Sequence, residues 1–344
     1  MDGDGALLVD KPAGPTSHDI VAIVRRALQT PRVGHTGTLD PLATGLLVLL
    51  VGQATRCAQF LVADEKEYIA DVRLGMATET YDADPVNFRL KAQATEGVVD
   101  VPRDPGGFRL RPEDLDRVLA EFRGSFMQTP PPYSAKKVDG VRAYKSARRN
   151  QAVDLKPVDV TVHELDIIPD ASPSSEPSPR DSDLPPRASD LAPRPPDIAP
   201  RDPGTLLRLR IVCSAGFYVR SLAHDIGQRL GCGAHLEALR RTRVGRFSVA
   251  DAISLAELDA QGPMTQERLI PLNTLLADMP AVTLNAEGVR RVAHGNTLAA
   301  EHLTGPLADM AGHPEARVLD ADGRLLAVAE RSAGGLLHPI LVLR

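Results

Sequence analysis

The sequence predicts an α+β protein that ends in a small β-rich module, and three observations lead to this prediction. Apolar residues make up 43% and charged residues 25% of the 344 residues, which is typical of a globular chain with a sizeable core. Expected strands and helices are interleaved without the regular spacing of βαβ units, which argues against a doubly wound fold. After about residue 277, short apolar runs are separated by turns.

Hydrophobic periodicity places the elements of the first part of the chain. They are a strand at Ala6–Val9, a helix at Ser17–Leu28, a buried strand at Leu46–Val51, a helix at Ala54–Val62 and a strand at Glu67–Leu74. Thr16 or Ser17 is suited to cap the first helix, because a hydroxyl there accepts from the free amides of the first turn.

The second part continues this mixed pattern. We expect a helix at Pro112–Phe122, strands at Val158–Ile168 and Thr205–Cys213, and a helix at Tyr218–Leu230 that Gly231 ends. The terminal module carries apolar runs at Ala281–Leu284, Arg317–Leu319, Leu325–Ala329 and Leu336–Leu343. Two domains are therefore expected, residues 1–276 and residues 277–344.

A proline-rich segment interrupts the first domain. Residues 169–203 contain 11 prolines in 35 positions and no aromatic residue, so this stretch cannot bury enough apolar surface to fold by itself. A seven-residue unit recurs in it, but a proline in every unit excludes a coiled coil. Both flanks alternate like strands, so we expect a disordered loop that joins two strands of one domain.

Charge and cysteine content limit the classes of function. The formal net charge is -5, so no overall positive field indicates a nucleic-acid partner, and local basic segments must carry that case. Three scattered cysteines form neither a disulfide framework nor a CxxC zinc pair. No signal peptide or membrane-spanning run is found, so we expect a soluble, cytoplasmic protein.

The densest candidate for chemistry is the glycine-rich stretch Val33–Leu47, which contains a single carboxylate, Asp40. Glycine and proline bend the backbone sharply there and let another chain approach closely. A structural alternative is that Asp40 caps a helix or turn beginning at Pro41. His35 has a similar alternative as a turn residue that bonds the local backbone.

A second candidate lies where a strand gives way to a helix. Tyr218 and Arg220 stand at the helix entrance, and a guanidinium there could orient a carboxylate through paired hydrogen bonds. From propensity alone, a surface arginine and a half-buried core tyrosine are the simpler interpretation.

Two basic segments could contact phosphates. One contains Lys136 and Lys137 with Arg142, Lys145, Arg148 and Arg149, and the other contains Arg240 and Arg241 with Arg243 and Arg246. A solvated surface is the usual meaning of such a run. The sequence has no GxxxxGK[ST], GxGxxG, HExxH or GxSxG motif. Functions that depend on ATP, NAD or zinc are therefore disfavoured.

Six blocks resemble the bacterial tRNA pseudouridine synthase B family, whose members isomerise uridine 55 in the T loop of tRNA. They are DKPAGPTSHD (10–19), GHTGTLDPLATGLL (34–47), EYIADVRLG (67–75), PPPYSAKKVDGVRAY (130–144), CSAGFYVRSLAHDIG (213–227) and GCGAHLEALRRTRVGRF (231–247). The blocks follow the family's order across residues 6–250. Residues 169–203 and Asp84–Gly107 are longer than is usual in this family.

The resemblance implies roles for particular residues. Asp40 is implied to be the nucleophile and Arg220 its ion-pair partner, while Tyr68 is implied to stack on the target base and to help in proton transfer. His35 is implied to enter the RNA loop, Tyr218 to lie beside the nucleophile, and Leu239 to contact the flipped nucleotide.

The resemblance also implies an overall organisation. It implies a catalytic domain built on a mixed, largely antiparallel sheet, with a C-terminal PUA-like barrel that binds RNA. No metal or other cofactor and no protein partner is implied, and a monomer that binds the T arm of tRNA suffices.

Two other functions stay open at this stage. A non-catalytic tRNA-binding or tRNA-folding factor would also use the basic segments and the C-terminal module. A glycosidase or nucleosidase could use Asp40, but such enzymes usually need a second carboxylate, and the matched blocks offer none.

Overall fold

The computed structural model describes residues 3–62, 65–83, 112–134, 137–138, 141–142, 155–168, 206–305, 313–332 and 334–343. The chain forms two compact units. Unit 1 comprises Met1–Tyr68 and Arg240–Arg344, and unit 2 comprises Ile69–Leu239. The chain passes from one unit to the other within strand β4 (Lys66–Leu74) and again within strand β10 (Ala234–Val244).

Unit 1 is built around strands β1 (Gly5–Lys11) and β3 (Thr44–Val51), which pair in antiparallel fashion along their whole length. The strand order is β12-β1-β3-β10, with β12 (Ile253–Ser254) parallel to β1 and β10 parallel to β3. Short strands β2 (Val33–His35), β11 (Phe247–Ser248) and β13 (Ile270–Pro271) pair with β3, β10 and β1.

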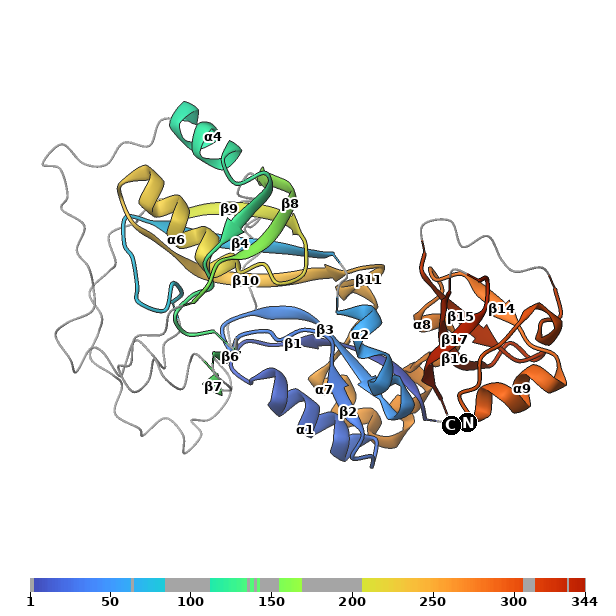
Figure 1. Ribbon diagram of the computed structural model, residues 1–344. Coiled ribbons are helices and arrows are strands. Elements are labelled where there is room, and N and C mark those ends of the chain that lie inside the picture. Colours follow the sequence, from blue (N-terminus) through green and yellow to red (C-terminus); the bar gives the residue numbers. More distant parts are fainter. Residues whose placement is uncertain are drawn as a thin grey trace, which may run out of the picture. The chain divides into compact units, whose positions relative to one another are not determined.

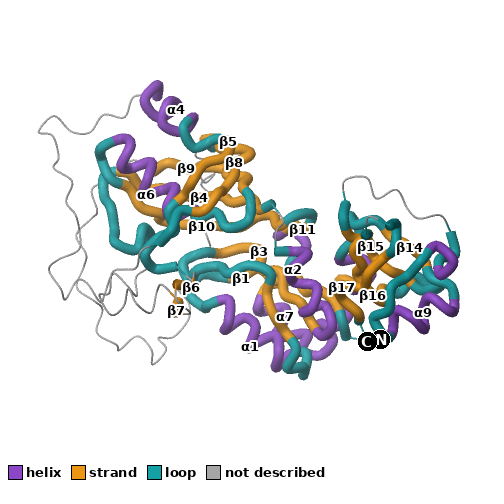
Figure 2. The backbone as a smooth tube through the Cα atoms, in the orientation of Figure 1, coloured by secondary structure: helices purple, strands orange, loops and turns teal. Residues whose placement is uncertain are grey.

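Two helices of unit 1 begin at capping boxes. Helix α1 (Ser17–Ala27) opens with a capping box between Thr16 and Asp19, which confirms the predicted cap. Helix α7 (Leu255–Gln261) opens with the same device, and it packs against α1 beside β1 (Figure 2).

Five further helical segments of unit 1 are short. They are η1 (Gly52–Cys57), α2 (Ala58–Leu61), η3 (Val249–Asp251), η4 (Gly262–Arg268) and α8 (Leu272–Leu275). The helix predicted at Ala54–Val62 is therefore a 3-10 segment followed by one α-helical turn. No helix follows Asp40 within residues 36–43, so the helix in the capping alternative is wrong, whereas the turn beginning at Pro41 is present.

Unit 2 carries strands in the order β4-β9-β8-β5. Strands β8 (Val158–Ile167) and β9 (Leu206–Cys213) are antiparallel, as are β5 (Gly124–Gln128) and β8. Helices α4 (Pro112–Ala120) and α6 (Val219–Leu230) pack against each other (Figure 1). A separate hairpin pairs β6 (Lys137–Val138) with β7 (Val141–Arg142). The mixed, largely antiparallel α+β architecture is thus confirmed.

The proline-rich segment joins two neighbouring strands, as the sequence predicts. Residues 158–167 and 206–213 pair in β8 and β9, and the amide of Ile168 donates to the carbonyl oxygen of Arg208 at 2.9 Å. Residues 169–203 and Asp84–Gly107 lie outside the described residues, so what the sequence predicts for their interiors stays a prediction.

The C-terminal part of unit 1 is a second, four-stranded sheet in the order β14-β15-β16-β17. Its strands are β14 (Ala281–Thr283), β15 (Glu315–Leu319), β16 (Leu325–Arg331) and β17 (Leu337–Val342). Helix α9 (Ala286–Ala293) packs on β16 and β17, and η5 (Ala300–His302) follows it. The four predicted apolar runs all fall on strands, which agrees with a PUA-like module.

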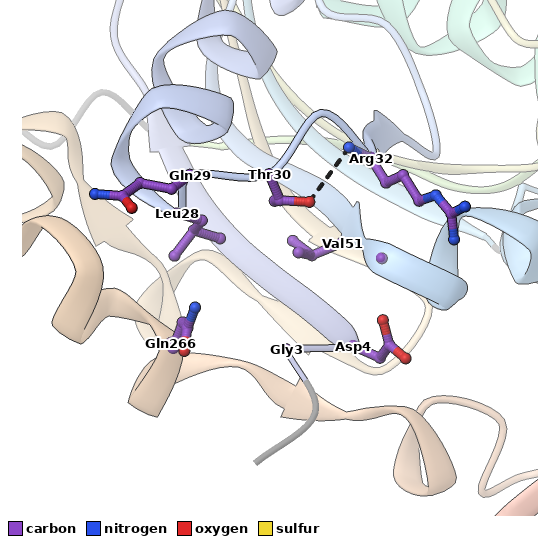
Figure 3. Close-up of a pocket in the computed structure, with 9 residues that line it drawn as sticks. Gly3, Asp4, Leu28, Gln29, Thr30, Arg32, Val51 and Gln266 are labelled. Atoms are coloured by element: carbon purple, nitrogen blue, oxygen red, sulfur yellow. Dashed lines mark hydrogen bonds between the residues drawn. The ribbon is translucent and has the colours of Figure 1, made fainter. Parts of the chain in front are cut away.

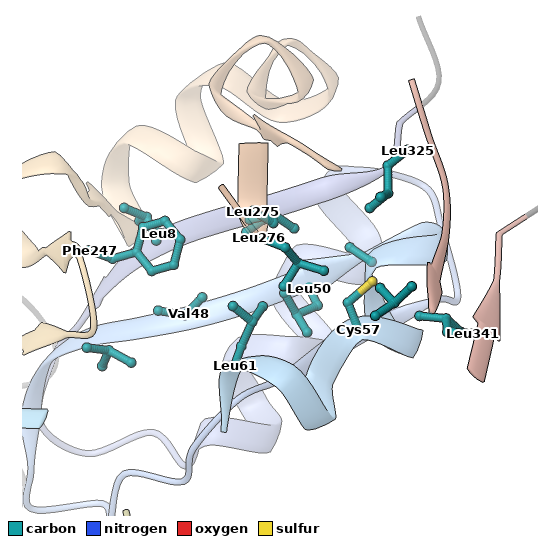
Figure 4. Close-up of a cluster of buried hydrophobic side chains, with 14 of the residues drawn as sticks. Leu8, Val48, Leu50, Cys57, Leu61, Phe247, Leu275, Leu276, Leu325 and Leu341 are labelled. Atoms are coloured by element: carbon teal, nitrogen blue, oxygen red, sulfur yellow. The ribbon is translucent and has the colours of Figure 1, made fainter. Parts of the chain in front are cut away.

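One apolar cluster joins this second sheet to the first. Leu325, Val328 and Leu341 pack with Leu8, Leu50, Cys57 and other buried side chains of unit 1 (Figure 4). A further cluster fills the inside of the second sheet, around Val282, Leu298 and Val318. The boundary predicted between residues 276 and 277 stays a prediction, because the two sheets share a core.

Candidate active site

Asp40 lies in a tight turn between β2 and β3. The amide of Ala43 donates to the carbonyl oxygen of Asp40 at 3.0 Å, which closes the turn. Gly45 follows in β3, two residues after Ala43, with φ of +97°. A side chain at this position would place its Cβ 2.2 Å from the carbonyl oxygen of Arg241. Only glycine permits β3 to leave the turn this close to β10.

The turn is attached to helix α1 and to the segment before it. The hydroxyl of Ser17 donates to the carbonyl oxygen of Leu39 at 3.0 Å and accepts from the amide of Leu39 at 2.9 Å. The amide of Gly14 donates to the carbonyl oxygen of Pro41 at 2.8 Å. Ser17 and Leu39 are both buried, so these bonds are shielded from water. The backbone on each side of Asp40 is therefore fixed.

Lys11 also holds the turn, although the sequence analysis did not predict it as a site residue. It has no exposed surface, and its Nζ donates to the carbonyl oxygens of Ala43 at 2.6 Å, Pro12 at 2.8 Å and Pro41 at 3.3 Å. Burial lowers the pKa of Lys11 to about 8, the Asp40 carboxylate opposes that change, and Arg241 adds to it. Lys11 thus ties the turn and places a positive charge near Asp40.

Arg241 holds the other side of the same turn. It is only 2% exposed, and its guanidinium donates to the carbonyl oxygens of Leu46 at 2.7 Å and Gly37 at 3.1 Å. The guanidinium is buried and bonded to the backbone, so its position does not support the phosphate contact predicted for Arg241. Arg241 instead ties residues on both sides of the Asp40 turn.

His35 ends β2, at the start of the turn. It is half-buried, and its ring meets the ring of His18 on α1 edge to face, with 5.6 Å between centroids. Asp40, Lys11, His35 and Arg241 are thus gathered in one part of unit 1.

Tyr218 and Arg220 lie together at the start of α6 in unit 2, as predicted. Arg220 is 7% exposed, and its Nη1 lies 3.3 Å from Oδ2 of Asp82. The guanidinium also donates to the carbonyl oxygens of Thr80 at 3.3 Å and Tyr133 at 3.1 Å. Asp82, itself 4% exposed, is a partner that the sequence analysis missed. The one feature of the sequence that could have indicated Asp82 is that this carboxylate follows shortly after the strand that bears Tyr68.

Gln128 fixes the backbone of Tyr218 through two hydrogen bonds. Its Nε2 donates to the carbonyl oxygen of Tyr218 at 3.0 Å, and its Oε1 accepts from the amide of Tyr218 at 2.8 Å. The hydroxyl of Ser221 adds a bond to the carbonyl oxygen of Thr129 at 2.8 Å. Because Gln128 is buried, this amide clamp sets the position of the first residues of α6.

Tyr68 and Leu239 are the last residues of their units before the chain crosses. Tyr68 is 7% exposed on β4 and Leu239 is 9% exposed on β10. The predicted pairing of Asp40 with Arg220 joins residues of different units and stays a prediction.

A pocket of about 360 Å³ lies elsewhere in unit 1 (Figure 3). It is found at the Val51 end of β3, whereas Asp40 precedes the Thr44 end. Its lining consists of Gly3, Asp4, Leu28, Gln29, Thr30, Arg32, Val51, Gly52 and Gln266. None of the predicted site residues lines it.

Two family models match this chain. Residues 25–176 match the model of the TruB family pseudouridylate synthase N-terminal domain, and residues 220–279 match that of the tRNA pseudouridylate synthase B C-terminal domain. The tRNA pseudouridine synthase B of Solibacter usitatus is 36% identical over 99% of this chain and 100% of its own length. That of Thermobifida fusca is 39% identical over 98% of each chain. The chain belongs to the tRNA pseudouridine synthase B family.

Solved structures agree on the fold of this family member. A chain in the structure of an H/ACA ribonucleoprotein bound to a substrate RNA containing 2'-deoxyuridine gives a TM-score of 0.63 at 21% identity, covering 99% of this chain and 86% of that one. A chain of a Cbf5-Nop10-Gar1 complex gives 0.63 at 23% identity, covering 99% and 84%. The family membership makes this chain a pseudouridine synthase, an isomerase that acts on uridine in tRNA.

The other residues that this family member was predicted to use for RNA binding are placed as follows. Arg240 is partly exposed and forms two bonds with Asp10, at 3.0 and 2.7 Å. Lys137 lies on β6, whose side chains are not described, and Lys136 lies outside the described residues. Their phosphate contacts stay predictions.

Two findings concern the described residues only. Within them, no group of three or more His, Cys, Asp or Glu residues could hold a metal ion. In the same part of the chain, no helix is both long and apolar enough to cross a membrane.

Proposed function

We propose that this chain converts uridine 55 in the T loop of tRNA to pseudouridine, with the carboxylate of Asp40 as the nucleophile. The observation that carries the proposal is the fixation of the Asp40 turn by Ser17, Lys11 and Arg241, while Asp40 itself keeps part of its surface exposed. A nucleophile held in this way needs little reorganisation when the substrate arrives.

The reaction breaks the bond between C1' and N1 of the nucleotide and forms a bond between C1' and C5. The hydrogen on C5 leaves as a proton, and N1 gains a proton. No electron is gained or lost, so one nucleophile and groups that move protons meet the balance. The base must first leave its stack, which costs a few kcal/mol that contacts to the RNA must recover.

We assign the remaining roles from the family pattern and from each side chain's place. Tyr68, a largely buried ring on β4, supplies a face for the extruded base, and Leu239 supplies an apolar contact. We assign Arg220 as the ion-pair partner of Asp40 in the reaction, with Tyr218 next to that pair. His35 enters the RNA loop from the end of β2.

RNA contacts outside the site depend on shape and charge. Folded RNA of this kind is recognised mainly through its shape and its phosphates. We assign phosphate contacts to Lys136, Lys137 and Arg240, and the C-terminal module adds surface for RNA. In this proposal the chain acts as a monomer without a protein partner.

Tritium release from tRNA labelled at C5 of uridine tests the proposal. The wild-type chain should release one tritium per tRNA, and a transcript with cytidine at position 55 should release none. Asp40→Asn should abolish release and leave tRNA binding close to wild type, because shape and phosphate contacts remain. Full activity in Asp40→Asn would refute the nucleophile, and release from the cytidine transcript would refute the position.

Asp40→Asn also distinguishes the proposed enzyme from the alternative function, a non-catalytic tRNA-folding factor. A non-catalytic tRNA-folding factor would accelerate tRNA annealing equally well in the wild-type chain and in Asp40→Asn. An annealing activity that survives alongside abolished release would show that both roles coexist.

A further inference from the structure

The ring of Tyr81 stacks on the imidazole of His224 in unit 2. The ring centroids are 3.8 Å apart and the planes differ by 13°, which is a face-to-face contact. Both residues are half-buried. Burial lowers the pKa of His224 and raises the pKa of Tyr81, so both rings are neutral at neutral pH. The pair is therefore a packing contact between neutral rings.

The backbone of Tyr81 is strained. Its φ is +64°, a conformation that costs a residue with a bulky side chain about 1–3 kcal/mol. In the described part of the chain only Gln29 shares a positive φ among residues other than glycine, and Gln29 merely ends α1, where Thr30 donates back to Arg25. Tyr81 ends no helix, so its strain needs another account.

The strained residue directly precedes Asp82, the partner of Arg220. On either side of Asp82 the chain is tied to β10, because the amide of Leu236 donates to the carbonyl oxygen of Tyr81 and the amide of Ala83 donates to that of Leu236, both at 2.9 Å. The hydroxyls of Thr78 and Thr80 donate to the carbonyl oxygen of Asp82 at 2.9 and 3.2 Å. The positive φ turns the chain so that ring and carboxylate both reach α6.

Arg220 and His224 are four residues apart on α6, so their side chains lie on the same face of the helix. Two consecutive loop residues thus contact two residues one helical turn apart: Asp82 meets Arg220, and Tyr81 meets His224. The carbonyl oxygens of Thr80 and Tyr133 also hold the guanidinium, at 3.3 and 3.1 Å. The stack adds a second contact between this loop and α6, one helical turn beyond the ion pair.

We infer that Tyr81 and His224 are positioning residues, whose stack holds Asp82 against Arg220 and thereby fixes the direction of the Arg220 guanidinium. Neither ring touches the reacting atoms in this inference. It rests on the proposed function, because it matters for catalysis only if Arg220 acts in the reaction.

Three variants test the inference by separating ring, hydroxyl and backbone. Tyr81→Phe keeps the ring and should behave like the wild type. Tyr81→Gly suits the positive φ but removes the ring, and His224→Ala removes the other half of the stack. For each of the last two, we expect kcat for tritium release to fall about 10- to 100-fold with KM for tRNA nearly unchanged. Tyr81→Asn, which tolerates the same backbone conformation, replaces Tyr81→Gly if that chain does not fold.

A matched control distinguishes positioning from general loss of packing. Phe122→Ala removes another ring from unit 2, one that is 5% exposed and contacts Phe126. It should lower the melting temperature without lowering kcat of the folded fraction. If Tyr81→Gly and His224→Ala behave like Phe122→Ala, with kcat unchanged in the folded fraction, the inference is overturned.

A double variant tests whether the effect passes through Asp82. Tyr81→Gly should lower kcat much less in an Asp82→Asn background than in the wild-type chain, because the group it positions is already lost. Equal factors in the two backgrounds would overturn the inference. Arg220→Lys distinguishes failure of the proposed function from failure of this inference. Full activity of Arg220→Lys would refute the proposed role of Arg220. An inactive Arg220→Lys together with fully active Tyr81→Gly and His224→Ala would refute the positioning inference alone.

Discussion

Single residues around Asp40 show which parts of a site a sequence can reveal. Asp40 stands out as the one carboxylate in a glycine-rich stretch, but that pattern also fits a capping residue, and its role as nucleophile is implied by the family resemblance. Lys11 could not be, since nothing local indicates that a lysine six residues into a strand is fully buried and bonded to carbonyls some 30 positions away. Buried cations of this kind become visible only when the acceptors are in place.

Replacing Lys11 tests its role as a tie. Lys11→Met keeps a similar length of side chain but leaves three carbonyl oxygens without their donor, and unsatisfied buried acceptors cost about 1–3 kcal/mol. We expect a lower free energy of unfolding in urea and a kcat lowered about 10-fold or more, as the Asp40 turn loosens. Arg26→Met, which removes an exposed cation at the end of α1, is the control and should change neither quantity.

The charge of Lys11 gives a pH dependence with a definite sign. Its pKa is about 8 in the folded chain and near 10.5 in the unfolded chain, so between these values the unfolded chain binds more protons. Its contribution to the free energy of unfolding therefore rises with pH through this window, by up to about 3 kcal/mol. Urea unfolding of the wild type and Lys11→Met at pH 7.5 and pH 10 should show a difference that shifts in favour of the wild type. A constant difference would contradict the pKa assigned to Lys11.

At the scale of elements, most strands and helices follow from periodicity, and β10 shows where that fails. Its sequence alternates, but two arginines on it resemble a basic patch because their partners are elsewhere in the chain: backbone carbonyls for Arg241 and Glu65 for Arg243. A strand whose charged residues are neutralised by distant partners cannot be told from an RNA-binding surface by composition. Helix α6, by contrast, ends at Gly231 with φ of +70° as its sequence predicts.

The start of α6 offers a test of the Gln128 clamp. Gln128→Leu keeps the volume but removes the side-chain acceptor of the Tyr218 amide and one donor to the Tyr218 carbonyl oxygen, which still accepts from the amide of Leu222 at 3.2 Å. We expect a loss of stability of about 1–3 kcal/mol and a further drop in kcat of the folded fraction, because Tyr218 and Arg220 move together. Gln59→Leu, at an exposed position, is the matched control. A kcat equal to that of the wild type would show that the clamp serves stability alone.

The pairing of β8 with β9 predicts tolerance to a large deletion. Since Ile167 already faces Leu209 across the pair, removal of residues 170–202 leaves Pro169 and residues 203–205 to close a short connection. The shortened chain should keep its melting temperature within a few degrees and retain most of its tritium-release activity. Loss of folding would show that the proline-rich segment contributes to the structure.

At the scale of the whole molecule, the chain's two ends build one unit. Unit 1 contains Met1–Tyr68 and everything from Arg240 onwards, so its core forms only after the intervening residues have been made. Sequence patterning predicts that the last 65 or so residues form a β-rich module, but it cannot show which apolar side chains face the module's own core and which face another sheet. Leu325 and Leu341 contact the cluster shared with β1 and β3, whereas Val318 belongs to the module's own core.

This shared core predicts that the C-terminal sheet is needed for the stability of the Asp40 region. A chain that ends at Met279 loses Leu325, Val328 and Leu341 and exposes the side chains they cover, among them Leu50 and Cys57. Each large apolar side chain uncovered costs about 1.5–3 kcal/mol, so the truncated chain should unfold at a distinctly lower urea concentration. Leu341→Ala should reproduce part of this loss, about 2–4 kcal/mol, in the full-length chain, whereas Leu336→Ala, at an exposed position, should not. If the chain ending at Met279 kept both the wild-type unfolding midpoint and wild-type tritium release, the C-terminal sheet would be an independent domain that starts near residue 277, as the sequence alone predicts.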